Sequence, residues 1–265
     1  MSEQSVSSRI DERGVATLTL NRPQVHNAFD DHLIASLTHE LRELEHNARV
    51  RVVVLAAEGK SFSAGADLYW MQRMAKYSEA DNIRDAVALA NLMRVLDTMS
   101  KPTIARVQGA AFGGGVGLVA CCDIACASSA AVFCLSEVRL GLIPAVISPY
   151  VIAAMGKRNA RRYFLTAERF DANEALRIGL VHSVVEPGRL DTSLTQLIDE
   201  LLKGGPHAIA EAKDLIASVA NRPIDQALAE NTAARIARIR VSSEGQEGTN
   251  AFLEKRAPAW VKAKP

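Results

Sequence analysis

Two short segments of this 265-residue chain have the composition of loops that bring main-chain N–H groups close to a ligand. One is the run Gly113–Gly115, followed by Gly117, at the start of an apolar stretch. The other is Ser61–Asp67, which follows a strand-like apolar run and contains only one large side chain. Glycine in such places costs conformational entropy but lets another group approach the backbone closely. We therefore expect both segments to serve a ligand or a reaction.

The chemistry that suits such loops is stabilisation of negative charge. The first N–H groups of a helix have no intrahelical partners, and the helix dipole favours an anion there. Two N–H groups from separate loops could converge on one oxygen that becomes negative during a reaction. Two alternatives stay open. The segments can be simple tight turns, or Gly115–Ala120 can be a GxGxxA dinucleotide motif, although Gln108–Gly114 separates it from the preceding strand.

The composition is that of an ordinary globular chain, with 48% hydrophobic and 23% charged residues and a formal net charge of +1. Such a balance gives no general basic surface, so we expect neither nucleic acid nor membrane as a partner. The polar N-terminus lacks the apolar core of a secretory signal, and no apolar run is long enough to span a bilayer. We therefore expect a cytoplasmic protein.

Four cysteines, Cys121, Cys122, Cys126 and Cys134, lie among apolar residues in one short region. Their spacing is not that of a CxxC…CxxC metal site, and no histidine is nearby in the sequence. We interpret them as reduced cysteines packed as small hydrophobic residues. No metal site is expected.

Hydrophobic periodicity predicts an α/β architecture over the first two-thirds of the chain. Strands are predicted at 15–20, 51–57 and 103–107, helices at 30–45 and 80–99, a loop at 58–66, and short apolar pieces at 123–128 and 131–135. From about residue 159 the pattern is helical, with one strand at 180–185 and helices at 191–203, 207–220 and 225–241. A helical tail of this kind suggests packing against the body or against other subunits.

Six segments together resemble the crotonase, or enoyl-CoA hydratase/isomerase, superfamily. They are LNRPQVHNAF (20–29), FSAGADL (62–68), IARVQGAAFGGGVGLVACCDIA (104–125), SEVRLGLIPA (136–145), ALRIGLVHSVV (175–185) and AFLEKRAP (251–258). The resemblance implies a crotonase-like α/β spiral of ββα units in residues 1–200, which holds the CoA and acyl site. It also implies that residues 201–265 form a helical region for trimerisation, giving a homotrimer or a dimer of trimers.

The same resemblance implies the roles of particular residues. The N–H groups of Ala66 and Gly114 would bind the oxygen of an acyl-CoA thioester. The CoA groove would include Arg22, Gln24, Ala28, Ala64, Asp67 and Leu68, with Phe252 and Lys255 helping to close it, in some relatives across a subunit boundary. No cofactor is expected, because CoA belongs to the substrate.

Hydratases that this chain resembles generally place two glutamates beside the reacting carbons. The second matches Glu137, but the first falls at Gly117. A single carboxylate suits an enoyl-CoA isomerase as well as a hydratase, and a non-catalytic acyl-CoA-binding protein is a third alternative. A panel of thioesters separates these classes, since water addition removes the conjugated enoyl absorbance.

A narrower resemblance concerns PAVISPYV at 144–151, which stands where many relatives have a PGxGGTQ segment. It is similar to bacterial hydratases of 3-methylglutaconyl-CoA and isohexenylglutaconyl-CoA in leucine and acyclic-terpene breakdown. We hypothesise that Gly117 leaves space for the β-substituent or distal carboxylate of such a substrate. The other candidate residues of the acyl site are Arg139 for the carboxylate, Ser148 and Tyr150 for water, and Tyr69, Trp70, Met71 and Met74 for the acyl pocket.

Overall fold

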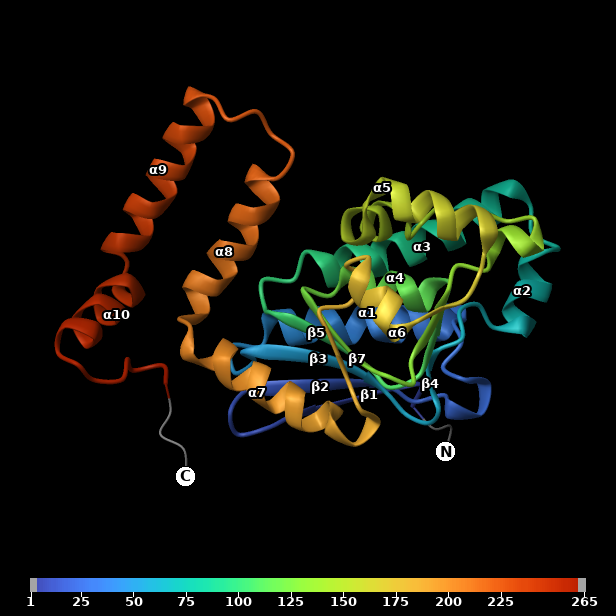
Figure 1. The fold of residues 1–265 in the computed structure, drawn as a ribbon, viewed down its shortest axis with the longest axis horizontal. Coiled ribbons are helices and arrows are strands. Elements are labelled where there is room, and N and C mark those ends of the chain that lie inside the picture. Colours follow the sequence, from blue (N-terminus) through green and yellow to red (C-terminus); the bar gives the residue numbers. More distant parts are fainter. Residues whose placement is uncertain (1–3, 262–265) are drawn as a thin grey trace.

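The computed structural model describes residues 4–261, which form two β-sheets with helices around them (Figure 1). The larger sheet has the order β1–β2–β3–β5–β7–β10, in which only the β1–β2 pair is antiparallel. Its strands are β1 (Val6–Ile10), β2 (Val15–Leu20), β3 (Val52–Ala57), β5 (Thr103–Val107), β7 (Ile124–Ser128) and β10 (Ser183–Val185). The smaller sheet has the order β4–β6–β8–β9, with strands Ser61–Ser63, Ala110–Phe112, Val132–Cys134 and Phe170–Asp171.

Successive units of the chain give one strand to each sheet and then continue into a helix. Strands β3 and β4 lead to α2 (Leu68–Met74) and α3 (Glu79–Asp97), and β5 and β6 lead to α4 (Gly114–Cys121). Strands β7 and β8 lead to a 3-10 helix, η2 (Glu137–Leu140), and to α5 (Ser148–Thr166). This arrangement confirms the expected α/β spiral of ββα units. It places the end of each small-sheet strand close to the start of a helix.

The first long helix, α1 (Asp31–His46), shows why these elements form where the pattern predicts. The carboxylate of Asp30 accepts a hydrogen bond from the N–H of Leu33 at 2.7 Å, which caps the helix. Apolar residues at helical spacing then bury one face of α1; they are Leu33, Ile34, Leu37, Leu41 and Leu44. The N-terminus of α3 carries a capping box formed by Ser78 and Asp81.

The large sheet is covered on both faces (Figure 1). On one face, Val53 and Leu55 of β3 join the main core with residues of α1 and α3. On the other face, Val52 and Val54 pack with Leu190, Leu194 and Ile198 of α7 (Leu190–Lys203). This two-sided burial explains why the sequence of β3 is almost continuously apolar.

The last three helices stand away from the body as an arm (Figure 1). They are α8 (Pro206–Val219), α9 (Gln226–Val241) and α10 (Ser243–Leu253). Several large apolar side chains of this arm are exposed, namely Ile216, Ile224, Ile236, Val241, Phe252 and Leu253. An exposed apolar surface of this kind favours packing on other subunits. The trimer stays a prediction, because the structure describes one chain.

The sequence pattern missed the shortest and most polar elements. The predicted loop 58–66 contains β4, and the polar N-terminal segment contains β1, whose residues are mostly exposed. Strand β9 and helix α2 also went unpredicted, whereas α6 (Ala172–Arg177) and α10 lie within stretches that were expected to be helical but were given no bounds. An edge strand such as β1 buries little surface, so its residues carry no strong alternation. The four cysteines are buried and free, as interpreted from their surroundings.

None of the helices within residues 4–261 is long and apolar enough to cross a bilayer.

Polar contacts join the arm to the body of the molecule. Lys213 of α8 donates from Nζ to Asp123 Oδ2 at 2.6 Å and to the carbonyl oxygen of Lys101 at 3.1 Å. The side chains of Lys213 and Asp123 are 17% and 29% exposed, so the ion pair is partly shielded from solvent. Its loss therefore leaves a half-buried carboxylate without its cation.

We predict that Lys213→Met lowers the free energy of unfolding by about 1–3 kcal/mol, since hydrogen bonds to charged groups contribute about that much. Lys203→Met is the matched control, because the Lys203–Glu200 pair is exposed and should change stability by less than about 0.5 kcal/mol. Urea unfolding at one protein concentration measures both. Equal effects of the two substitutions would show that the Lys213 contact does not anchor the arm.

Candidate functional site

The two glycine-containing segments meet through Phe29. The N–H of Phe29 donates to the carbonyl oxygen of Gly65 at 2.7 Å, and the N–H of Asp67 donates to the carbonyl oxygen of Phe29 at 2.8 Å. Phe29 and Ala66 thus form a parallel β-bridge. In such a bridge the residue between the two bonded positions, here Ala66, directs its own N–H away from the partner segment. The N–H of Ala66 therefore points away from Phe29.

The second segment ends at the N-terminus of α4. Gly113 has φ +49°, donates from its N–H to the carbonyl oxygen of Cys134 at 2.9 Å, and accepts from Val116 at 2.9 Å. This leaves Gly114 in the first turn, where N–H groups have no intrahelical acceptor. Within residues 4–261, neither the N–H of Gly114 nor that of Ala66 has a hydrogen-bond partner.

The two segments approach each other so closely that only glycine fits at the contact. A Cβ atom on Gly65 would lie 3.1 Å from the carbonyl oxygen of Phe112 and 3.8 Å from the nitrogen of Gly113. Gly65 also has φ +88°, which side chains rarely adopt. On the other side of α4, the ring of Phe29 lies 3.2 Å from the position of a Cβ on Gly114. Ala66 and Gly114 consequently lie on adjoining loops.

The carboxylate of Glu137 lies at this junction. Its Oε1 atom is 3.1 Å from the position that a Cβ on Gly113 would take. Its Oε2 atom is buried and has no hydrogen-bond partner in the described part of the chain. Burial raises the pKa of Glu137 above its ordinary value, which a hydrogen bond from the backbone opposes only in part. A carboxylate in this state is suited to accept and return a proton.

A buried asparagine that the sequence analysis did not single out holds the first loop in place. Asn27 is fully buried and donates from Nδ2 to the carbonyl oxygens of Glu58, at 2.8 Å, and Ser61, at 2.9 Å. Its Oδ1 atom accepts from the N–H of Arg22 at 2.8 Å. Asn27 has φ +55°, a conformation that asparagine tolerates better than most residues. These bonds fix the segment before Phe29 against the strand that leads to Gly65.

The guanidinium of Arg22, a predicted CoA contact, is paired with carboxylates of this chain. Its guanidinium forms ion pairs with Asp30 at 2.8 Å and Asp67 at 3.2 Å, and donates to the carbonyl oxygen of Ala28 at 2.7 Å. Only 17% of its side chain is exposed. Two carboxylates already engage this charge, and a contact of Arg22 with CoA stays a prediction. Arg22 instead ties the loop before Phe29 to the loop after Gly65.

The other predicted CoA residues divide by exposure. Asp67 is buried and caps α2, where its Oδ1 accepts from the N–H of Tyr69 at 2.9 Å and from that of Trp70 at 3.2 Å. Ala28 is buried, Ala64 is half-buried, and Gln24 and Leu68 are exposed. A direct CoA contact of these residues stays a prediction.

Phe252 and Lys255 lie at the far end of the arm from these loops. Phe252 is 81% exposed, and Lys255 follows the end of α10. In Figure 1, α10 and α2 are on opposite sides of the molecule. Within one chain these two residues therefore do not approach the loops. The alternative that they close the site of a neighbouring subunit stays a prediction.

The expectation of open space at Gly117 is wrong. A Cβ on Gly117 would lie 2.9 Å from Cβ of Ile147 and 3.2 Å from Cε of Met93. Ile147 is buried at the start of α5, so the volume that a side chain on Gly117 would take is already filled by an apolar one. Gly117 permits this close packing of α5 on α4 and leaves no cavity there.

The two residues expected to hold water, Ser148 and Tyr150, lie in the first turn of α5. The hydroxyl of Ser148 donates to the carbonyl oxygen of Ala145 at 2.8 Å, which is a local contact at the helix start. Burial raises the pKa of Tyr150, and the nearby Cys121 and Asp97 add to that rise. A role of Tyr150 in holding water beside Glu137 stays a prediction.

The residues expected to line an acyl pocket include both core and surface positions. Trp70 is buried in the main core and Met74 packs against it, whereas Tyr69 is 74% exposed and Met71 is half-buried. Arg139 is exposed, two residues after Glu137. Trp70 therefore acts mainly in packing, and Tyr69 and Arg139 are available to a ligand.

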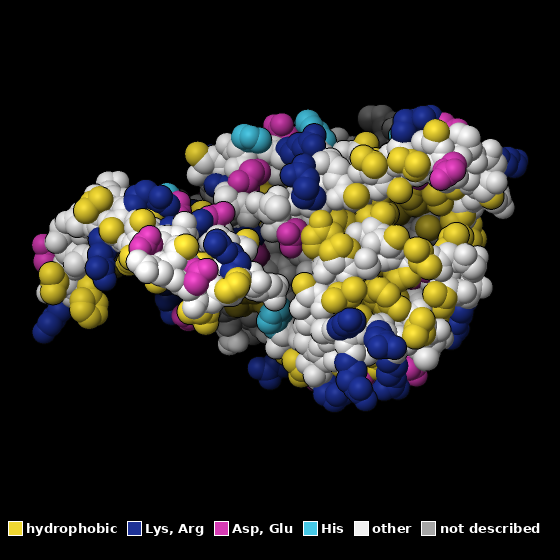
Figure 2. Space-filling model, turned by 90° about the horizontal axis from the view of Figure 1, so that it is seen from above, with side chains coloured by type: hydrophobic (Ala, Val, Ile, Leu, Met, Phe, Trp, Pro, Cys, Tyr) yellow, Lys and Arg dark blue, Asp and Glu magenta, His cyan; other side chains and the backbone are white. Residues whose placement is uncertain are grey.

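Apolar side chains surround a hollow on the face of the molecule that includes α2, α3 and α5 (Figure 2). The exposed large hydrophobic residues of these helices, of η2 and of the segment after it include Leu68, Tyr69, Ile83, Val87, Leu140, Leu142, Ile143 and Ile152. Three of them follow Glu137 within six residues. An apolar surface beside the carboxylate is suited to an acyl chain.

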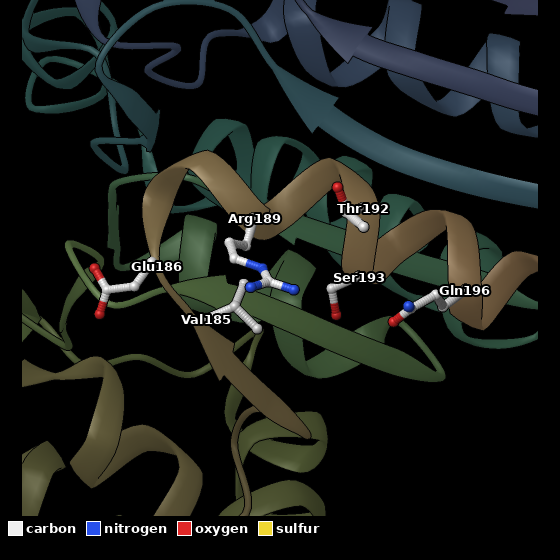
Figure 3. Close-up of a pocket in the computed structure, with 6 residues that line it drawn as sticks. All are labelled: Val185, Glu186, Arg189, Thr192, Ser193 and Gln196. Atoms are coloured by element: carbon white, nitrogen blue, oxygen red, sulfur yellow. The ribbon is translucent and has the colours of Figure 1, made fainter.

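A second hollow lies at the beginning of α7 (Figure 3). Its lining residues are Val185 and Glu186 at the end of β10, Arg189 of the 3-10 helix η3 (Pro187–Arg189), and Thr192, Ser193 and Gln196 of α7. None of the predicted site residues lines it. The candidate reaction site is therefore the junction of Gly65, Gly113 and Glu137.

Three supporting residues were missed because their importance depends on tertiary contacts. Asn27 lies in a segment that the resemblance contains, and its type is a weak signal for a left-handed backbone. Ser63 is fully buried and donates to the carbonyl oxygen of Asn27 at 2.9 Å. Ile147 contacts Gly117 from 30 positions away in the sequence. No local pattern indicates that contact.

Comparison with known proteins agrees with this geometry. The family model for enoyl-CoA hydratase/isomerase matches residues 11–263. A putative enoyl-CoA hydratase from Thermus thermophilus is 32% identical over 252 residues, which cover 95% of this chain and 99% of the relative. The chain therefore belongs to the enoyl-CoA hydratase/isomerase family and is a hydro-lyase-type enzyme that acts on acyl-CoA thioesters.

Two solved structures show the same fold. An enoyl-CoA hydratase from Shewanella pealeana is 50% identical, with a TM-score of 0.95 and coverage of 98% of this chain and 97% of that one. A putative enoyl-CoA hydratase/isomerase (crotonase) from Legionella pneumophila is 48% identical, with a TM-score of 0.93 and coverage of 98% and 100%. The α/β crotonase fold is thereby confirmed along almost the whole chain.

We predict that Gly113→Ala lowers kcat, whereas a control variant with comparable backbone strain keeps the wild-type kcat. The added methyl group would press on Glu137 Oε1 and would force a side chain into a backbone conformation with positive φ. Gly156→Ala in α5 is the control, since Gly156 has φ +75° and no atom within 4 Å of its Cβ position. Each change should cost about 1–3 kcal/mol of stability through backbone strain. If both variants keep equal activity, the contact between Gly113 and Glu137 has no catalytic importance.

Proposed function

We propose that this enzyme reversibly adds water to the α,β double bond of a branched glutaconyl-type acyl-CoA thioester, with Glu137 as its one proton-transferring carboxylate. The observation that carries the proposal is the buried, unpartnered Oε2 of Glu137 at the junction of two loops whose N–H groups are free. Candidate substrates are 3-methylglutaconyl-CoA and isohexenylglutaconyl-CoA, from leucine or acyclic-terpene breakdown.

In this proposal the N–H groups of Ala66 and Gly114 bind the thioester oxygen. Glu137 takes a proton from water while the oxygen of that water bonds to Cβ. The π electrons of the double bond move towards the carbonyl and form an enolate, whose negative oxygen the two N–H groups stabilise. The enolate then takes the proton from Glu137 at Cα. The carboxylate is thereby regenerated, and the net change is addition of one water molecule.

The branched, acidic substrate class is supported by the surroundings of Glu137. Arg139 is exposed and has no ion pair within residues 4–261. Burial raises the pKa of Cys134, which Arg139 and Arg169 oppose and Glu137 increases further, so both arginines act in the same neighbourhood as Glu137. A guanidinium in this place suits a distal carboxylate, which it can bind through two parallel hydrogen bonds. The exposed apolar residues Leu142 and Ile143 offer a surface for the branch.

An enoyl-CoA isomerase is the second candidate, because Ile147 and Met93 make the region over Gly117 apolar. An isomerase needs one carboxylate to move a proton between two carbons and needs no bound water. The two candidates differ in the product. Hydration removes the conjugated enoyl absorbance by adding water, whereas isomerisation moves the double bond without doing so.

Assembly and closure of the CoA site form part of the proposal. The exposed apolar residues of the arm support a homotrimer or a dimer of trimers. In such an assembly, Phe252 and Lys255 of one subunit would reach the CoA groove of another.

We predict that Glu137→Gln lowers kcat/KM for the correct thioester by about 100-fold or more, since general acid–base catalysis contributes about 10²–10⁴. Steady-state assays with 3-methylglutaconyl-CoA, isohexenylglutaconyl-CoA and crotonyl-CoA measure this loss. Glu43→Gln on the exposed face of α1 is the control and should leave the rate unchanged. Normal turnover by Glu137→Gln would contradict the proposed mechanism.

We also predict that Glu137→Gln raises the melting temperature at neutral pH. Burial raises the pKa of Glu137 in the folded state above that in the unfolded chain, so ionisation opposes folding. The group is protonated in both states below its unfolded pKa, and its effect on stability is therefore lost there. The gain from Glu137→Gln should be present at pH 7 and should shrink as the pH falls towards 4. A stabilisation independent of pH would show that the charge of Glu137 carries no cost.

A further inference from the structure

The volume above the first turn of α4 is bounded by two residues of one segment, Glu137 and Ile147. Glu137 Oε1 lies 3.1 Å from the Cβ position of Gly113, and Ile147 Cβ lies 2.9 Å from that of Gly117. Residues three or four apart on a helix lie on the same face. The carboxylate and the branched apolar side chain therefore contact the same turn of α4, which also presents the N–H of Gly114.

The direction of Cβ on a helix places Ile147 near the reacting atoms. A helical side chain leans towards the N-terminus and covers the turn before its own Cα. A side chain at position 117 would thus lie over Gly113 and Gly114, and Ile147 occupies that volume instead. Met93 of α3 completes this apolar wall, with Cε 3.2 Å from the same Cβ position.

Ile147 is held firmly in this position. It is buried, with only 3% of its surface exposed, and its carbonyl oxygen accepts from the N–H of Val151 at 3.1 Å in the first turn of α5. Its branched side chain has few rotamers available. The wall is therefore a fixed feature of the fold rather than a flexible surface.

We infer that Ile147 is a specificity-determining residue of the reaction site. Its apolar side chain occupies the volume above Gly117, and a polar side chain in that volume could otherwise act on the substrate. The inference rests on the proposed function and extends it. Among the residues that the structure describes, the wall leaves Glu137 as the one carboxylate at the substrate, and water must approach from the side of Glu137. It also limits the size of the acyl group that fits above the first turn of α4.

The first test compares Ile147→Ala with wild type on crotonyl-CoA and 3-methylglutaconyl-CoA. Removing the branched side chain opens space for a β-substituent, and small differences in a hydrophobic pocket change discrimination by about 10–200-fold. We expect the ratio of kcat/KM for the branched thioester to that for crotonyl-CoA to rise by about 10-fold or more.

Ile178→Ala is the matched control, because Ile178 is equally buried in the main core but lies at the end of α6. Ile178→Ala should lose comparable stability and keep the wild-type ratio of kcat/KM for the branched thioester to that for crotonyl-CoA. An unchanged ratio in Ile147→Ala, with activity on both thioesters retained, would overturn the inference while leaving the proposed function intact. Absence of turnover by the wild-type enzyme on every enoyl thioester would instead overturn the proposed function.

The second test restores a carboxylate to α4. Gly117→Glu alone should fail to give folded enzyme, since its side chain collides with Ile147. Gly117→Glu combined with Ile147→Ala should fold. Its pH profile should then shift towards higher pH relative to Ile147→Ala, because two nearby carboxylates raise the pKa of one of them.

A purely structural role of Ile147 would leave that pH profile unchanged. If Ile147→Ala does not rescue the folding of Gly117→Glu, or if the rescued enzyme keeps the profile of Ile147→Ala, the wall does not border the reaction site. Either result would overturn the inference.

Discussion

A carboxylate with one oxygen buried and without a hydrogen-bond partner among the described residues is the constraint on which the site depends. An unpaired polar group of this kind costs free energy, so the surrounding structure must hold it in place. Glu137 is held by a 3-10 helix that follows β8, beside Gly113, whose positive φ would be strained for any residue with a side chain. The protein thus accepts a local loss of stability and obtains a group whose pKa is raised towards the range that acid–base catalysis requires.

The fold brings that carboxylate to two free N–H groups by joining loops from successive ββα units. Phe29 contacts both loops, through hydrogen bonds to the backbone beside Ala66 and through its ring on Gly114. The Arg22 ion pairs with Asp30 and Asp67 tie the segment around Phe29 to the loop that contains Ala66. Rigid support of this type matters because catalytic donors lose effect when they are displaced by as little as about 1 Å.

The sequence predicts the parts of this structure that depend on local pattern or on resemblance. Strand β2, helix α1 and helix α9 lie within one residue of their predicted bounds, because apolar spacing and capping residues mark them. The glycine segments were singled out by their composition, whereas the role of Glu137 was predicted only through resemblance, since no periodicity identifies a catalytic carboxylate. The filling of Gly117 by Ile147 and the pairing of Arg22 with two aspartates could not be predicted, because partners distant in the sequence decide them.

The central claim concerns the state of one carboxylate, so its titration is the most direct measurement. The enzyme is labelled with ¹³C at its glutamate carboxyl groups, and the signal of Glu137 is assigned by its loss in Glu137→Gln. The account predicts that Glu137 titrates clearly above the ordinary glutamate value of about 4.3. A titration at or below that value would show that the carboxylate is solvated or paired, and would contradict the account.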